Sequence, residues 1–113
     1  MQPESAALVW DARRAAELIR SFVEGRTWPD YVDDPMLQSA VERQFEIIGE
    51  ALNRLARVDP DVAEGIDDLA RIVAFRNVLI HGYATIDDAI VWEVATERLS
   101  HLVELLTGLL DEG

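Results

Sequence analysis

Apolar residues recur every three or four positions along almost the whole chain of 113 residues, and this spacing limits the possible folds more than any other feature. Residues at that spacing share one face of an α-helix, whereas a strand needs an alternation that the chain does not show. We therefore expect an all-α fold. With short connections between four long segments, the best match is an antiparallel four-helix up-down bundle, in a single domain over residues 1–113.

Proline, aspartate and glycine mark the expected helix ends. Asp34-Pro35 and Asp59-Pro60 each place a capping side chain before a proline, so a second main helix should start at the first pair. The second pair should start a short extra helix before the third main helix. Gly25 and Gly82 should end the first and third main helices, and residues 25–34 should form a loop.

The third and fourth main helices each carry an apolar stripe that should be buried. In the third helix, which Asp67 or Asp68 can cap, the stripe is Leu69, Ile72, Val73 and Ile80. The fourth should run to about Leu110 and bury Ile90, Val91, Val94, Leu99, Leu102, Leu105, Leu106 and Leu109.

The composition excludes several kinds of function. The chain has no cysteine, so it has no disulfide framework, no thiolate nucleophile and no cysteine-bound zinc. No apolar run approaches the ~20 residues of a membrane span, no basic-then-apolar leader opens the chain, and the cytoplasm is the expected compartment. With 22 acidic residues against 10 basic ones, all arginine, the net charge of −12 argues against nonspecific binding of nucleic acids.

The charge is unevenly distributed, however. Residues 69–86 contain no carboxylate, although they hold Arg71, Arg76, Asn77, His81, Tyr83 and Thr85. Charges farther away than the Debye length of ~8 Å are largely screened at physiological salt, so this stretch is a local cationic surface in an anionic chain. The net charge therefore restricts nucleic-acid binding to one place and does not exclude it.

Arg76, Asn77 and His81 form the candidate site within this stretch. Asn77 and His81 are four residues apart and share a helix face, and the long Arg76 side chain can bend toward the last turn of the helix. An arginine can bind a phosphoryl oxygen pair, and a histidine can move a proton near neutral pH, so the set suits a phosphodiester. A structural alternative stays open, in which the histidine stabilises the helix end and the arginine ties helices together.

Other polar residues have more than one interpretation. Glu42, Glu46 and Glu50 form a stripe that could hold Mg²⁺, but the Glu-x-x-His repeats of di-metal bundles are absent, so we favour a structural role and predict no metal. Glu50 is our candidate to pair with Arg76 and hold it in place. His101 is expected to be a packing or surface residue.

The residues around Arg76 resemble the HEPN superfamily and, within it, the HepT-like toxins that act with MntA-like minimal nucleotidyltransferases. The family signature Arg-x4-His-x-Tyr appears as Arg76 to Tyr83, followed by Ile86-Asp87 and Val91-Trp92. Upstream, residues 46–51 (Glu-Ile-Ile-Gly-Glu-Ala) resemble the family's second-helix signature. The similarity covers about residues 39–92.

This resemblance implies a metal-independent endoribonuclease that acts as a homodimer without a cofactor, with Arg76 and His81 catalytic and Asn77 supporting them. A dimer also follows from the chemistry, because cleavage by the 2′-OH needs both a base and an acid, and one chain has a single suitable imidazole. A two-fold axis beside the third helix would bring two such histidines to one cleft.

The resemblance gives Tyr83 a separate role. In HepT-like toxins the nucleotidyltransferase antitoxin modifies this tyrosine with AMP and so silences the toxin; an added phosphate would repel and block RNA. The alternative from another functional class is a noncatalytic module that binds a nucleotide or a nucleotidyltransferase.

Overall fold

The structure is a computed structural model, which describes residues 1–82 and 86–112, and in these residues it contains helices and no strands. This confirms the expected all-α class. The elements are α1 (Pro3–Val23), α2 (Trp28–Val32), α3 (Pro35–Val58), α4 (Pro60–Glu64), α5 (Leu69–His81), α6 (Asp88–Glu93), the π-helix η2 (Val94–Arg98) and α7 (Leu99–Glu112).

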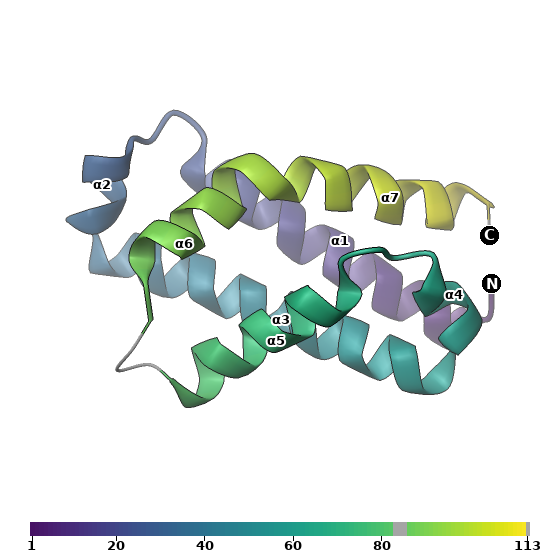
Figure 1. Cartoon of the computed structure of the whole chain (residues 1–113). Coiled ribbons are helices and arrows are strands. Elements are labelled where there is room, and N and C mark those ends of the chain that lie inside the picture. Colours follow the sequence, from purple (N-terminus) through teal and green to yellow (C-terminus); the bar gives the residue numbers. More distant parts are fainter. Residues whose placement is uncertain (83–85, 113) are drawn as a thin grey trace.

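The long helices run back and forth along the molecule. In Figure 1, α1, α3 and α5 alternate in direction, and α6, η2 and α7 follow one another as a fourth rod that returns beside α1. The two ends of the chain lie at the end of the bundle that carries α4. This is the arrangement of an up-down bundle with two short helices added at its corners. None of the helices in the described residues is long and apolar enough to cross a membrane.

The core lies between α1, α3 and α7, and α5 packs mainly on α3. Small residues on α1 let its neighbours approach closely: Ala12 and Ala16 are fully buried beside Val9 and Ile19. The principal large side chains that fill the core from the other helices are Val41, Phe45, Ile48, Leu52, Leu55, Leu99, Leu102 and Leu106.

Both aspartate–proline pairs start helices as predicted. The Asp34 carboxylate accepts a hydrogen bond from the Leu37 amide at 3.0 Å, which satisfies a free donor in the first turn of α3. The Asp59 carboxylate accepts one from the Val62 amide at 3.3 Å and another from the Ser5 hydroxyl at 2.5 Å. Asp59 therefore caps α4 and also fixes the start of α1 to this corner.

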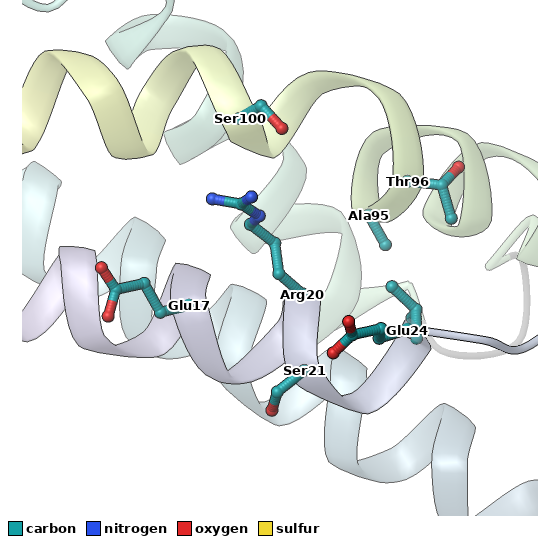
Figure 2. Close-up of a pocket in the computed structure, with 8 residues that line it drawn as sticks. Glu17, Arg20, Ser21, Glu24, Ala95, Thr96 and Ser100 are labelled. Atoms are coloured by element: carbon teal, nitrogen blue, oxygen red, sulfur yellow. The ribbon is translucent and has the colours of Figure 1, made fainter.

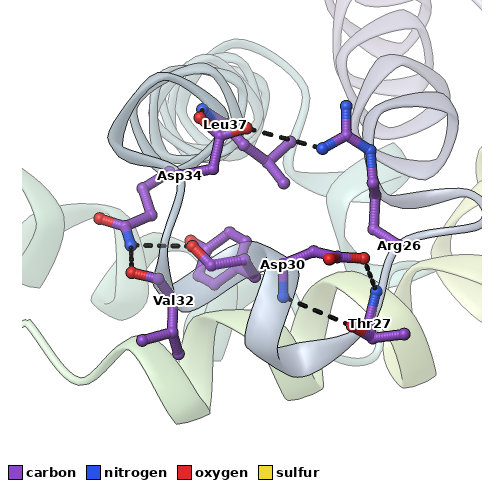
Figure 3. A network of polar contacts seen from close by, with 8 residues as sticks. Arg26, Thr27, Asp30, Val32, Asp34 and Leu37 are labelled. Carbon is purple, nitrogen blue, oxygen red and sulfur yellow. Dashed lines mark hydrogen bonds and ion pairs between the residues drawn. The ribbon is translucent and has the colours of Figure 1, made fainter.

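The expected loop over residues 25–34 contains the helix α2, so that prediction was wrong in part. Thr27 and Asp30 exchange hydrogen bonds as a capping box, and the Gln38 side-chain amide donates to the carbonyls of Tyr31 and Val32 at 2.9 and 3.0 Å (Figure 3). Tyr31 is fully buried, and its ring lies 5.3 Å from that of Trp92. Together these contacts hold a five-residue helix that its own length would not stabilise.

Two predicted apolar stripes differ from the structure. In α5 the buried residue is Leu79, and Asp68 precedes the helix without a side-chain cap. In the fourth rod, which begins at Asp88, Ile90 is half exposed whereas Val91 is buried. The π turn of η2 explains part of the second difference, because it changes the phase between α6 and α7.

Candidate functional site

Helix α5 carries the candidate site on a face that the rest of the chain leaves open. Arg76 is partly buried, whereas Asn77 and His81 are exposed. The Arg76 Nη1 atom donates a hydrogen bond to Asn77 Oδ1 at 3.0 Å. The structure thus joins two of the predicted site residues, and it turns the guanidinium sideways toward Asn77.

The nitrogen atoms of the Arg76 guanidinium differ in their burial and hydrogen bonding. Its Nε atom is buried and has no hydrogen-bond partner among the described residues. A buried polar group without a partner is costly, and such groups in native proteins often lie at functional sites. Because Nε faces the protein, the terminal Nη atoms are the ones that a substrate could reach.

His81 ends α5, one turn after Asn77. Within the described residues its imidazole makes no hydrogen bond or ion pair, with Arg76 or with any other residue. A single chain therefore presents an arginine and a free imidazole on one helix without joining them. Tyr83, the predicted site of AMP modification, lies outside the described residues.

The glutamates of α3 do not complete the site. Glu50 is exposed, and the described ion pairs include none between Glu50 and Arg76. Glu46 instead pairs with Arg43, with Nη1 and Oε2 3.2 Å apart. Burial, followed by the nearby charges of Asp88 and Glu46, raises the pKa of Glu42. Within residues 1–82 and 86–112, no group of three or more His, Asp or Glu side chains is placed to hold a metal ion.

His101 lies on the surface, one of its two predicted environments. Its Nε2 atom is 3.3 Å from Asp67 Oδ2, so it links α7 to the turn before α5. It lies away from the Arg76–Asn77 pair in sequence and has its own partner.

The sequence did not reveal an apolar groove beside α5. A cavity of about 390 Å³ lies between α5 and the α6–η2–α7 rod, and Phe75, Val78, Ile90 and Val94 contribute to its walls. Val78 and Ile90 remain 49% and 50% exposed. Val78 lies outside the predicted stripe of the third helix, and this is the sequence signal that could have indicated a second apolar surface; Ile90 was predicted to be buried.

A second hollow, of about 560 Å³, lies between the end of α1 and the η2–α7 segment (Figure 2). Arg20 reaches across it toward Ser100, with Thr96 on the same wall and Glu17 and Glu24 on the side of α1. The candidate site residues of α5 do not line it. The two carboxylates beside Arg20 make it a poor place for a phosphate.

Fold and site together define a class of protein: a small helical bundle that displays an arginine, an amide and an imidazole on one open helix. Residues 12–108 match the protein family described as "Ribonuclease HepT-like". The chain therefore belongs to the HepT-like ribonuclease family, which confirms the resemblance seen in the Arg76 to Tyr83 motif.

Relatives with known names agree with this family. The chain is 33% identical over 96 residues to "Probable ribonuclease HepT" of Thermococcus cleftensis, an alignment that covers 81% of this chain and 83% of that protein. It is 29% identical to a "Putative RNase" of Caldanaerobacter subterraneus subsp. tengcongensis, with 85% of each chain covered.

A third relative is longer than this chain. "Gamma-glutamylcyclotransferase and putative RNase" of Methanocaldococcus jannaschii is 30% identical over 85% of this chain, which spans only 43% of that protein's length. No solved structure matches the chain with significance.

Proposed function

We propose that this chain is a metal-independent endoribonuclease whose active site forms between two copies of the chain. The observation that carries the proposal is the Arg76–Asn77 pair on α5, one turn before a free and exposed His81. Membership of the HepT-like ribonuclease family supports it. Cleavage would use the substrate's own 2′-OH as the nucleophile.

The reaction needs a base, an acid and a group that stabilises charge on phosphorus. One His81 would accept the 2′-OH proton as the 2′ oxygen attacks phosphorus, and a second His81 would donate a proton to the leaving 5′ oxygen. The Arg76 guanidinium would stabilise the negative charge on the phosphoryl oxygens. The products would be a 2′,3′-cyclic phosphate and a free 5′-OH, with no net change in protons.

The groove beside α5 supports the dimer. Its walls are largely apolar, and half-exposed Val78 and Ile90 border it, whereas Arg76, Asn77 and His81 lie on α5 outside its lining. Burying such a face against a second copy would bring two α5 helices together around a two-fold axis.

The wider biological role in this proposal is the toxin of a toxin–antitoxin pair. A nucleotidyltransferase antitoxin would attach AMP to Tyr83, two residues after His81, and the added anion would repel RNA from the cleft. The resemblance in the Arg76 to Tyr83 motif supports this role. Modification can be tested by mass spectrometry of the chain after incubation with ATP and a cognate transferase, with Tyr83→Phe as the control.

The test of the ribonuclease uses two histidine variants. Purified wild-type protein, His81→Ala and His101→Ala are incubated with a labelled RNA in the presence of EDTA. We expect wild type and His101→Ala to cleave at similar rates and His81→Ala to lose cleavage, because the His101 imidazole is paired with Asp67, whereas the His81 imidazole has no partner among the described residues. Cleavage by His81→Ala at the wild-type rate would refute the mechanism.

A noncatalytic nucleotide- or transferase-binding module is the second candidate function. The net charge of −12 favours it, as does the lack of a hydrogen bond between Arg76 and His81 within the described residues. It predicts that the wild-type protein binds a nucleotide or transferase but leaves RNA intact in the same assay.

A further inference from the structure

Helices α3 and α5 touch most closely at a glycine. Gly49 is buried in the middle of α3, and a Cβ atom placed on it would overlap the Cβ of Arg76. The same atom would lie 2.6 Å from Arg76 Cγ and 3.4 Å from the Ile72 carbonyl oxygen. The first two carbons of the Arg76 side chain therefore occupy the space that any other residue at position 49 would need.

This contact restricts the arginine at two points. Its base is pressed against the backbone of α3 at Gly49, and its Nη1 atom is held by Asn77 Oδ1. Because the Nε atom between them is buried, the side chain has little freedom before its terminal nitrogens reach the surface. A long flexible side chain normally loses much rotamer entropy when it binds a ligand, and a side chain that is already fixed avoids that loss.

Close packing, and not backbone conformation, explains why position 49 is a glycine. Glycine inside a helix is less favourable than alanine, and the α3 backbone has no left-handed residue here that would require it. By contrast, a Cβ on Gly108 in α7 would meet nothing from the rest of the chain within 4 Å, so Gly108 offers a comparison without close packing.

We propose that Gly49 is a positioning residue for the reaction: it sets the depth of Arg76 between α3 and α5 and thereby the place of the guanidinium at the surface. This inference rests on the proposed ribonuclease function. It predicts that Gly49→Ala displaces Arg76 by at least about 1 Å, since carbon atoms in contact lie about 3.5–4.0 Å apart.

The packing step is tested with four proteins: wild type, Gly49→Ala, Arg76→Gly and the double variant, with Gly108→Ala as the control. Urea midpoints are measured by circular dichroism. We expect Gly49→Ala to lower the midpoint in the wild-type background but not in Arg76→Gly, where the overlapping Cβ is gone. Gly108→Ala should leave the midpoint unchanged or raise it. An equal loss in both backgrounds, or no loss in either, would overturn the inference.

The functional step is measured as kcat for RNA cleavage per folded molecule. A misplacement of about 1 Å can reduce catalysis about 100-fold, so Gly49→Ala should lose about that much and the double variant should be no worse than Arg76→Gly. Loss of stability alone would leave kcat per folded molecule unchanged. If Gly49→Ala does not fold, the double variant must fold as well as Arg76→Gly, or the inference is wrong.

The two proposals fail in different ways. An active wild type with an equally active, folded Gly49→Ala variant would refute the positioning role and leave the ribonuclease intact. A wild type that cleaves no RNA would refute the proposed function and the positioning role with it, whatever the urea midpoints show.

Discussion

The Ser5 hydroxyl joins the first turn of α1 to the corner between α3 and α4, and its removal should destabilise the fold. Ser5 is 1% exposed, and its Oγ atom donates to Asp59 Oδ2 at 2.5 Å. The other oxygen of the same carboxylate accepts from the Val62 amide at the start of α4. Ser21 offers a matched control on the same helix, because its exposed hydroxyl donates only to the Leu18 carbonyl within α1.

The size of the effect follows from two opposing contributions. A hydrogen bond to a carboxylate contributes about 1.5–3 kcal/mol, and alanine is about 0.5 kcal/mol better than serine inside a helix. Ser5→Ala should therefore lower the free energy of unfolding by about 1.5 kcal/mol, or the Tm by about 6 °C for a domain of this size. Ser21→Ala should stay within about 0.5 kcal/mol of wild type.

The assay is urea unfolding followed by far-UV circular dichroism, for both single variants, Asp59→Ala and Ser5→Ala/Asp59→Ala. If the hydroxyl acts through the carboxylate, Ser5→Ala should cost nothing further once Asp59 is replaced. The reasoning is refuted if Ser5→Ala costs no more than Ser21→Ala, or if its cost is the same with and without Asp59.

Three further predictions concern α5 and its surroundings. The raised pKa of Glu42 means that the folded chain holds this proton more tightly than the unfolded chain, so stability is lost as pH rises from 4.5 through the folded pKa. Glu42→Gln should thus stabilise the fold by about 0.5 kcal/mol at pH 7 and have no effect at pH 4, as measured by urea unfolding at both pH values. Leu79→Ala, which removes the buried side chain of α5, should cost about 2–4 kcal/mol and speed amide hydrogen exchange in α5 more than in α1. Val78→Asp should shift the protein from dimer to monomer in analytical ultracentrifugation while leaving its circular dichroism unchanged, because the side chain is 49% exposed in one chain; a dimer that persists would place the interface elsewhere.

The long helices were predictable because their starts depend on neighbouring residues. Asp34-Pro35 and Asp59-Pro60 combine a cap with a fixed backbone angle, and both start helices in the structure. Helix α2 starts with a local signal that was overlooked, the capping box of Thr27 and Asp30. Its burial, however, depends on contact between Tyr31 and Trp92, which is distant in sequence. Local patterns cannot report such contacts.

The contacts of the candidate site were predicted less well than the helix that carries it. Arg76 turns to Asn77, whereas the expected partner Glu50 is exposed on α3. The reason lies in helix geometry: Gly49 faces Arg76, and the next residue points about 100° away around the helix. The sequence showed which residues share the region, but the crossing of α3 and α5 decides which of them touch.

The π turn η2 has a consequence for how the length of this chain can change. Val91, Ala95 and Leu99 are buried at intervals of four residues, a spacing that drifts by about 80° over eight residues of a regular α-helix. The wider turn absorbs this drift, so that α6 can pack on α2 while α7 packs on α1. Loss of one residue within η2 (Val94–Arg98) would restore a regular helix. Loss of one residue within α7 would instead rotate the part of α7 that follows it out of the core. A one-residue deletion in this rod should therefore be tolerated best at η2.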